Sequence, residues 1–281
     1  MIDIKNVTYR YRRGPEALTE ISATLGEGVW LLLGENGAGK TTLIHTIAGL
    51  LLPQLGQVDV NGVNVATRLP GVISSIAILT DNYLFPASTI NEYSAFNSPF
   101  YPSFDAETLR SNLEAFDMTG NEQLGGMSMG TRKKAQLAYT LALRTPVILL
   151  DEPTIGLDID SRKIFRRLLA ANEVEGQTVV VSTHQTDDLG PLYSGVMIIN
   201  RSHLLLSMTT DEILSHLDFG VTPVPDRSAL YFEQDLGRFR TITANPTGEP
   251  QTDCDFALLY SAVMSSARDA VMSNLKPSAK L

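Results

Sequence analysis

A glycine-rich run between an apolar strand and an amphipathic helix restricts the fold of this chain more than any other feature. Residues 34–41 read Gly-Glu-Asn-Gly-Ala-Gly-Lys-Thr, which fits the pattern G-x-x-x-x-G-K-[ST]. The apolar segment Val29–Leu33 precedes the run, and a helix is expected to begin at Lys40. Glycines let such a loop curl until successive backbone N–H groups point at phosphate oxygens, and the helix N-terminus adds a positive partial charge. The context therefore predicts a phosphate-binding loop at this strand-to-helix junction.

Two side chains at the end of the loop have specific roles in this prediction. Lys40 would reach the β- and γ-phosphates of a nucleotide, and the Thr41 hydroxyl would bind Mg²⁺. The simpler alternative is a glycine-rich turn that only joins a strand to a helix. Four fixed positions match by chance in about 1% of chains of this length, and the flanking strand and helix make a chance match rarer still. We therefore assign nucleotide binding to Gly34, Glu35, Asn36, Gly37, Ala38, Gly39, Lys40, Thr41 and Thr42.

Two adjacent acids follow a second apolar strand. Val147–Leu150 is followed directly by Asp151 and Glu152. A carboxylate at the end of a buried strand can hold Mg²⁺, usually through water, and we assign that role to Asp151. Glu152 would orient or deprotonate an attacking water, a contribution of about 10²–10⁴ in rate. The alternative, that both acids only end the strand and cap the next segment, loses weight because a phosphate-binding loop lies upstream.

Composition excludes several broad classes of protein. The 281 residues carry 22 Lys and Arg against 31 Asp and Glu, a formal net charge of −9 that disfavours non-specific nucleic-acid binding. A hydrophobic fraction of 43% is typical of a globular chain and excludes a disordered or collagen-like one. A single cysteine, Cys254, fits a reducing compartment. We expect no secretory signal at the start and no membrane span, which would need about 18 consecutive apolar residues.

The order of strand and helix signals predicts an α/β fold. Short strands fill the first third of the chain, and two of them flank Asn61-Gly62, a strong hairpin signal. Three helices are expected next, over residues 90–96, 105–116 and 131–143. Apolar strands then alternate with helices up to residue 200, which is the pattern of a sheet buried on both faces.

Composition changes near residue 207, and no catalytic pattern occurs beyond it. We interpret Val221–Pro225 as a linker or extended turn. Segments 229–232 and 239–244 could pair as a small hairpin. We expect residues 208–281 to form a small α+β extension, either a plain structural appendage or a regulatory or dimer-bracing element.

A further segment gives a weak signal by itself. Ser128-Met129-Gly130-Thr131 precedes a predicted helix. Serine and glycine at a helix start are typical N-cap residues. The same geometry also binds phosphate, so a structural and a functional interpretation are compatible here.

Together these residues resemble the ATP-binding cassette (ABC) family of ATPases over roughly residues 1–207. Gly34–Thr42 resembles the family's Walker A loop, and Val147–Glu152 resembles its Walker B strand. Ser128–Thr131 stands where the family signature L-S-G-G-Q is expected, and Ile155–Asp158 resembles the D-loop. The motifs occur in the family order, so the joint pattern is highly specific.

Two single residues also match family positions. His184 occupies the position of the switch histidine, and Tyr11 falls where the family has an aromatic residue that stacks on adenine. Individually, His184 could be a satisfied polar residue at a strand end, and Tyr11 an ordinary strand aromatic. The resemblance implies that His184 contacts the γ-phosphate and, with Glu152 and Lys40, takes part in hydrolysis. It also implies that Ser128, Gly130 and Asp158 contact nucleotide.

The resemblance implies a P-loop NTPase fold of the ABC ATPase type. Such a fold has an antiparallel β subdomain, a parallel core sheet and an inserted helical subdomain, here over about residues 86–145. The resemblance also implies ATP and Mg²⁺ as cofactors and a head-to-tail pair of cassettes. Each nucleotide would contact Lys40 and Thr41 of one copy and Ser128 and Gly130 of the other. Loss of the γ-phosphate would remove the charge that two helix N-termini share, and the pair would open.

Some positions depart from the family pattern. Met127 and Met129 replace a leucine and a glycine of the signature, and Thr131 replaces its glutamine. Asp81 stands in place of the Q-loop glutamine; it could still approach Mg²⁺ or its water, but it is shorter. The residues expected to carry hydrolysis all fit the pattern, so we expect an active ATPase: Lys40, Asp151, Glu152 and His184.

Transport is the function that the resemblance implies. A single cassette without a membrane span would work with a separate transmembrane permease, on the cytoplasmic face of the cell membrane. It would act as a homodimer or paired with a second ABC ATPase. The aromatic-rich segment 81–104 is the expected docking region, although its rings could also form a local core. Analogy with single-cassette exporters favours export over uptake.

Two other classes of function fit the sequence less well than transport does. A soluble, non-transport ABC switch on ribosomes or chromosomes would generally carry two cassettes or long coiled coils, and this acidic chain has neither. A P-loop kinase or other small-molecule phosphotransferase would explain the phosphate-binding loop but would leave Ser128–Thr131, Asp158 and His184 without a purpose.

Overall fold

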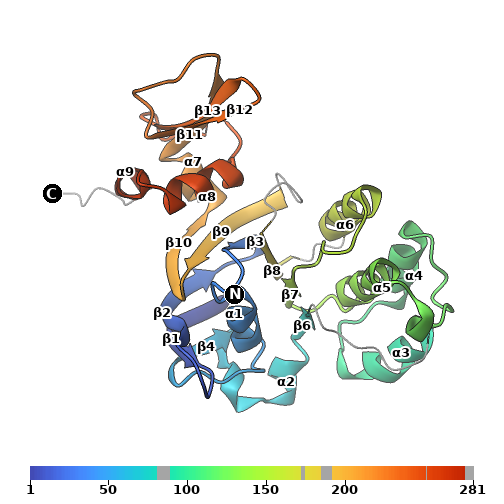
Figure 1. Ribbon diagram of the computed structural model, residues 1–281. Coiled ribbons are helices and arrows are strands. Elements are labelled where there is room, and N and C mark those ends of the chain that lie inside the picture. Colours follow the sequence, from blue (N-terminus) through green and yellow to red (C-terminus); the bar gives the residue numbers. More distant parts are fainter. Residues whose placement is uncertain (81–88, 172–174, 185–191, 251, 276–281) are drawn as a thin grey trace.

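A computed structural model describes residues 1–80, 89–171, 175–184, 192–250 and 252–275. The centre of the described structure is a six-stranded sheet in the order β10-β9-β3-β8-β7-β6 (Figure 1). Its inner strands are parallel, and β10 at one edge pairs antiparallel with β9. These strands are nearly continuous apolar runs because both faces of the sheet are covered. Their bounds are β3 Gly28–Leu33, β6 Ile76–Leu79, β7 Val147–Asp151, β8 Thr178–Thr183, β9 Tyr193–Asn200 and β10 His203–Thr209.

A second, antiparallel sheet covers one face together with helix α1, Lys40–Ile47. The predicted hairpin is confirmed: Asn61 and Gly62 have φ values of 48° and 79°, as a tight two-residue turn with positive φ at both positions requires. One buried apolar cluster contains residues from α1, from this sheet and from the six-stranded sheet, so α1 is fixed on both sides. The strands of the antiparallel sheet, in the order β2-β1-β4-β5, are β1 Ile2–Arg10, β2 Glu16–Leu25, β4 Leu55–Val60 and β5 Val63–Asn64.

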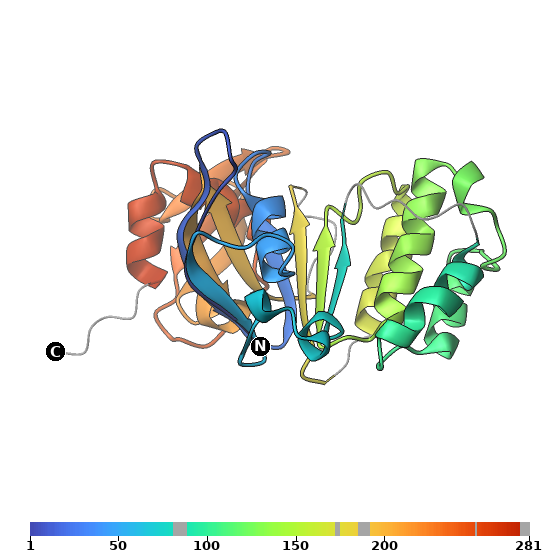
Figure 2. The ribbon, with the colours of Figure 1, turned by 90° about the horizontal axis from the view of Figure 1, so that it is seen from below.

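Helices gather at the β6 end of the six-stranded sheet, as both views show (Figure 1 and Figure 2). The three helices predicted in the middle of the chain are present, with small shifts at their ends. The helix predicted from residue 131 begins at Met129, because Ser128 caps it. These helices pack on the opposite face of the sheet from α1. The helices are α3 Ile90–Asn97, α4 Ala106–Ala115, α5 Met129–Ala142 and α6 Ile159–Ala171; short helical turns cover Val65–Thr67, α2 Pro70–Ile73, Ser98–Phe100 and Leu124–Gly126.

The C-terminal region forms a small three-stranded antiparallel sheet with helices beside it. The predicted hairpin is present as β12 and β13, which are joined by Leu236 and Gly237, both at positive φ. The predicted linker at Val221–Pro225 is wrong at its start, because Val221 and Thr222 pair with β13 as the end of β11. The elements are α7 Thr210–Leu214, β11 Leu217–Thr222, β12 Tyr231–Asp235, β13 Arg238–Ala244, α8 Phe256–Met264 and α9 Arg268–Leu275.

The C-terminal elements share a core with the β9 and β10 end of the large sheet. The Phe256 ring of α8 meets the ring of Tyr193 edge to face, with centroids 5.5 Å apart. The Thr210 hydroxyl donates a 2.6 Å hydrogen bond to the Tyr193 carbonyl. Strand β10 runs to Thr209, past the division expected at residue 207, and the same buried apolar cluster continues into α8. The division of the chain into 1–207 and 208–281 stays a prediction.

The helices differ from membrane spans in length and polarity. Within the described ranges, none of them is both long enough and apolar enough to cross a bilayer.

Candidate active site

The glycine-rich loop connects β3 to α1, as the sequence predicts. Gly39 is the N-cap of α1 and has a φ of 115°, a conformation that residues with a side chain rarely adopt. A Cβ atom at Gly39 would lie 2.5 Å from the carbonyl oxygen of Ala17 in β2. Only glycine therefore fits where the loop passes under the antiparallel sheet and turns into the helix.

Lys40 lies at the base of this loop and is 6% exposed. Its ammonium group donates to the carbonyl oxygens of Gly34 at 2.7 Å and Glu35 at 3.3 Å. It also forms an ion pair with Glu152, with Nζ 3.6 Å from Oε1. A buried lysine is stable only when its charge is matched in this way. The loop and the acid after β7 therefore meet around one ammonium group.

Asp151 at the end of β7 has a hydrogen bond on each carboxylate oxygen. The Thr41 hydroxyl donates to Oδ2 at 2.8 Å, and the Ser182 hydroxyl donates to Oδ1 at 2.5 Å. Asp151 is 2% exposed, so these two bonds replace the water that it would otherwise bind. The carboxylate is held in a fixed plane between α1 and β8.

Glu152, the next residue, has an unusual backbone conformation. Its φ is 46°, in the left-handed region, and its N–H donates to both the carbonyl and the hydroxyl oxygen of Ser182 at 3.1 Å. The carboxylate then lies between Lys40 and His184, whose Nδ1 is 3.1 Å from both carboxylate oxygens. Glu152 is 13% exposed and His184 40% exposed at the side chain, so the pair stands at the edge of solvent.

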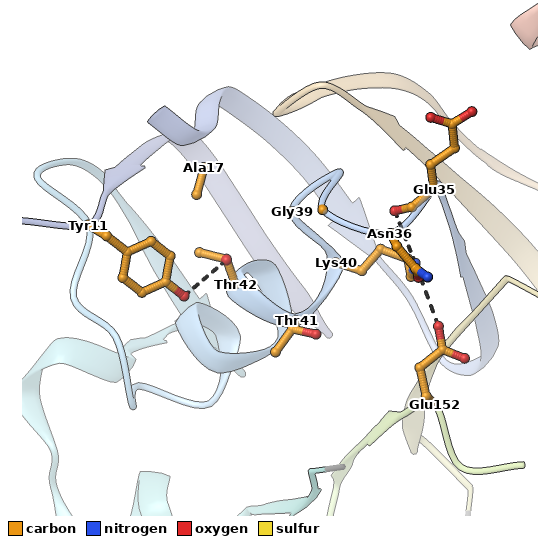
Figure 3. Close-up of a pocket in the computed structure, with 10 residues that line it drawn as sticks. Tyr11, Ala17, Glu35, Asn36, Gly39, Lys40, Thr41, Thr42 and Glu152 are labelled. Carbon is orange, nitrogen blue, oxygen red and sulfur yellow. Dashed lines mark hydrogen bonds and ion pairs between the residues drawn. The ribbon is translucent and has the colours of Figure 1, made fainter. Parts of the chain in front are cut away.

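A cavity of about 300 Å³ runs along the loop, with Tyr11 at one end and Glu152 at the other (Figure 3). The Tyr11 hydroxyl lies 3.2 Å from that of Thr42, and the Tyr11 ring meets the Tyr9 ring edge to face at 5.0 Å. Tyr11 is 45% exposed and lines one end of the cavity. The lining residues are Tyr11, Ala17, Glu35, Asn36, Gly37, Gly39, Lys40, Thr41, Thr42 and Glu152.

The segment predicted as the signature lies elsewhere. Ser128 caps α5, where its hydroxyl accepts the Thr131 N–H at 3.2 Å. A Cβ atom at Gly130 would lie 2.6 Å from the carbonyl of Gly156, so the first turn of α5 touches the turn at Gly156. Asp158 accepts the Ser161 N–H at 2.7 Å, and hydrogen bonds from Ser161 hold the pKa of its carboxyl below the usual value.

The predicted residues thus fall into two groups within the described ranges. Lys40, Thr41, Asp151, Glu152 and His184 converge on the glycine-rich loop. Ser128, Gly130 and Asp158 are not among the described residues that line this cavity. Asp81, the predicted additional Mg²⁺ contact, lies outside the described residues.

Three residues near the site were not singled out by the sequence. Ser182 links Asp151 to Glu152, and Ala17 lines the cavity from β2. Tyr260 of α8 lies near enough to Glu35 for that carboxylate to affect its pKa. Burial, and then the nearby Glu35 carboxylate, raise the pKa of the Tyr260 phenol. The spacing of residues along the sequence does not predict that β2 and α8 lie near the loop, because both positions depend on the tertiary fold. Ser182 stands next to the Thr183-His184 pair, which is the signal that could have identified it.

Known proteins with this sequence pattern identify the family. Residues 18–155 match the model of the family described as ABC transporter. The energy-coupling factor transporter ATP-binding protein EcfA of Methanosphaera stadtmanae is 32% identical over 228 residues, which are 76% of this chain and 81% of that protein. This chain belongs to the ABC transporter family. As an ATP-binding member of that family, it binds ATP and hydrolyses it.

Two solved structures support the ABC fold. The ATP-binding cassette MJ0796, described as a dimer in a post-hydrolysis state bound to ADP and phosphate, is 26% identical with a TM-score of 0.64. That match covers 74% of this chain and 98% of the other. A structure of a putative cobalt transport ATP-binding protein, cbiO-2, is 20% identical with a TM-score of 0.66, and it covers 96% of this chain and 99% of that one. The ABC fold likeness therefore extends into the C-terminal region.

Proposed function

We propose that this chain is the ATPase subunit of an ABC transporter and that it drives a separate membrane permease. The observation that carries the proposal is the convergence of Lys40, Glu152 and His184 at one end of a cavity that starts at Tyr11. A site for a nucleoside triphosphate needs an apolar platform for the base, a cradle for the phosphates and a positioned acid for water. The cavity offers these three parts in that order.

Each residue has a step in the proposed hydrolysis. The curled loop and Lys40 hold the β- and γ-phosphates, which the ammonium can do by exchanging its present carbonyl partners for phosphate oxygens. Glu152 accepts a proton from the attacking water. His184, 3.1 Å from that carboxylate, orients it and reaches toward the γ-phosphate. Catalysis of this kind consists mostly of positioning and charge stabilisation.

The donor set fits Mg²⁺. The Thr41 hydroxyl and the Asp151 carboxylate are adjacent, and both are oxygen donors, which this cation prefers. No group of three or more acidic, His or Cys side chains suited to a metal occurs in the described ranges. A cation held by one carboxylate, one hydroxyl, phosphates and water needs no such group. Thr41 and Asp151 would hold the ion, which would neutralise charge on the phosphates when bound.

Replacing the proposed base tests the hydrolytic mechanism. Glu152→Gln keeps the size of the side chain but cannot accept the proton, so ATP turnover should fall by about 10²-fold or more while ATP still binds. The measurement compares the rate of phosphate release with the affinity for ATP in the same preparation. Undiminished turnover would remove Glu152 from this role. Release of phosphate without a phosphorylated product would also exclude a phosphotransferase.

Two copies complete the site in this proposal. Ser128 and Gly130 stand at the start of α5, a 14-residue helix whose N-terminus favours anions. Because these residues do not line the cavity of their own chain, a second copy would supply them to the γ-phosphate. The solved dimer of the cassette MJ0796 supports such pairing in a related protein. The pair is a homodimer or includes a second ABC ATPase.

The permease is proposed to dock on α3 and the turn that follows it. Phe96 and Phe100 there are 77% and 64% exposed. Phe104 instead packs on the Tyr139 ring at 6.2 Å, so part of the aromatic segment is local core. Residues 81–88 of the predicted docking segment lie outside the described residues.

A docking test compares exposed aromatics at two places. Phe96→Ala with Phe100→Ala should release the chain from membranes that contain its permease, without lowering ATPase activity of the free chain. Phe232→Ala, which alters an exposed ring of the C-terminal sheet, is the matched control. Equal release by both variants would contradict docking at α3.

Location and direction of transport follow from the family resemblance and stay proposals. The chain would sit on the cytoplasmic face of the cell membrane. The likeness to single-cassette exporters favours export, whereas two of the related proteins are named for an energy-coupling factor transporter and for cobalt transport. Inside-out membrane vesicles supplied with ATP would accumulate substrate under export and lose it under uptake.

The C-terminal region is proposed as a structural extension of the ATPase core. Its helix α8 shares the buried cluster with β9 and brings Tyr260 near the Glu35 carboxylate of the loop. A regulatory or dimer-bracing role for residues 208–281 would act through the core that α8 shares with β9.

A further inference from the structure

Ser182 is a fully buried polar residue near the C-terminal end of strand β8. It lies in β8, among the valines Val179, Val180 and Val181, and its exposure is 0%. The register of the parallel strands β7 and β8 places Asp151 directly beside Ser182. A buried hydroxyl costs free energy unless it is hydrogen-bonded, so its partners indicate why it is there.

The hydroxyl group of Ser182 bonds to both members of the acidic pair. It donates its proton to Asp151 Oδ1 at 2.5 Å. It also accepts the N–H of Glu152 at 3.1 Å, and the Ser182 carbonyl accepts the same N–H at 3.1 Å. Because a hydroxyl has one donor and two acceptor positions, it can hold both partners at once.

The two bonds have different geometric consequences. The bond to Asp151 occupies Oδ1 and leaves Oδ2 to face the Thr41 hydroxyl, which is 2.8 Å away. The bond from Glu152 helps to hold that residue at a φ of 46°, which costs free energy for a residue with a Cβ atom. With this backbone conformation, the Glu152 carboxylate meets both Lys40 and His184.

We propose that Ser182 is a positioning residue for ATP hydrolysis, because its hydroxyl fixes the Asp151 carboxylate and the Glu152 backbone relative to each other. Ser182 does not line the cavity and does not touch the nucleotide in this scheme. It acts by keeping the proposed cation ligand and the proposed base in register. The inference rests on the proposed roles of Asp151 and Glu152.

The test removes the hydroxyl and compares turnover with binding. In Ser182→Ala, kcat for ATP should fall by about ten- to a hundredfold, since small misplacements of a catalytic group have effects of that size. The affinity for ATP in EDTA should stay within about twofold, because the phosphate cradle is intact. Ser182→Thr, which keeps the hydroxyl, should recover most of the lost kcat.

Thr178→Val is the matched control. Thr178 lies at the other end of β8, and its hydroxyl donates to the Gly26 carbonyl at 2.9 Å. The variant removes one buried-strand hydroxyl at similar volume but away from the acids, so kcat should be unchanged. Thermal melting shows whether each variant folds. Ser182→Ala removes only the hydroxyl group, so its kcat decides the test even if threonine does not fit at this position.

Three results would overturn the inference. The first is a kcat of Ser182→Ala within twofold of the unmodified chain. The second is an equal loss of kcat in Thr178→Val, and the third is an ATP affinity in EDTA that falls as much as kcat. Failure of the proposed base is distinguishable, because it would appear as undiminished turnover in Glu152→Gln.

Discussion

At the scale of single residues, the site is organised by charged and polar side chains that face one another across three elements. Lys40 from α1 and His184 from the end of β8 both meet the Glu152 carboxylate that follows β7. Lys40 and Glu152 would be costly to bury alone, and their ion pair matches the two charges at one end of the cavity. The proposed base, Glu152, therefore lines the end of the cavity opposite Tyr11.

Tyr11 provides a residue-scale prediction for the base of the nucleotide. Tyr11→Ala should weaken ATP binding by about 1–3 kcal/mol, the usual worth of a base–aromatic stack. Tyr11→Phe keeps the ring but loses the hydroxyl that lies 3.2 Å from Thr42, so its ATP affinity should be close to that of the unmodified chain. Calorimetric titration with ATP and with inorganic triphosphate separates the contributions of base and phosphates. A loss of triphosphate affinity in Tyr11→Ala would contradict a stacking role.

Sequence patterns predicted most residues of the candidate site, but not the residue that holds its two acids in place. The sequence singles out Gly34–Thr41 as candidates because the glycine-rich motif lies between an apolar strand and a helix. It singles out Asp151 and Glu152 because they follow an apolar run. Ser182 was not assigned a role, since a serine in a valine-rich strand carries no local signal for its partners. Those partners come from β7, which pairs with β8 in the fold.

At the scale of secondary-structure elements, the capping of α4 can be tested. Asp105 accepts the N–H groups of Glu107 and Thr108, and these bonds, that of Thr108 first, hold the pKa of its carboxyl below the usual value. Asp105→Ala should lower the free energy of unfolding at pH 7 by about 0.5–2 kcal/mol, as loss of a cap does. Asp105→Asn retains a capping oxygen and should be close to neutral at pH 7.

The pH dependence of this cap has a definite sign. A carboxyl whose pKa is lower in the folded state stabilises it above the unfolded pKa, and the stabilisation disappears as pH falls through the folded pKa. The difference between the unmodified chain and Asp105→Ala should therefore shrink on acidification below about pH 4. Urea unfolding at several pH values measures this. A difference that is constant down to about pH 2.5 would contradict the cap.

Element types were predicted well and their ends less well. Helices α3 and α4 begin and end within one residue of the ranges predicted for them. Strand β11 was missed because Thr222-Pro223 suggested a linker, whereas pairing with β13 extends the strand to Thr222. Tertiary pairing overrode the local turn signal there.

At the scale of the whole molecule, the shared core predicts cooperative unfolding. Phe256 is 6% exposed and packs on Tyr193, which belongs to the large sheet. Phe256→Ala should destabilise the entire chain by about 3–5 kcal/mol and shift a single unfolding transition. Circular dichroism, which reports on the whole chain, and ATP binding, which reports on the nucleotide site, should give the same midpoint of unfolding. An early, separate transition of the C-terminal region would show that residues 208–281 fold independently.

No pattern in the sequence predicted this shared core. The composition change near residue 207 indicated a boundary, yet β10 continues to Thr209 and α8 contributes to the same cluster as Val196 and Ile198. A boundary signal reflects local composition, whereas packing of α8 on β9 depends on residues about 60 positions apart.

The composite nucleotide site is tested most directly by the molar mass of Glu152→Gln in solution with and without ATP, measured by light scattering. Saturating ATP should double the mass, because in the proposed dimer each γ-phosphate would join Lys40 of one copy to Ser128 of the other. Adding Ser128→Arg should leave ATP bound to a monomer. A mass that stays monomeric with ATP bound, or one that still doubles when Ser128 is replaced, would contradict a site shared between two copies.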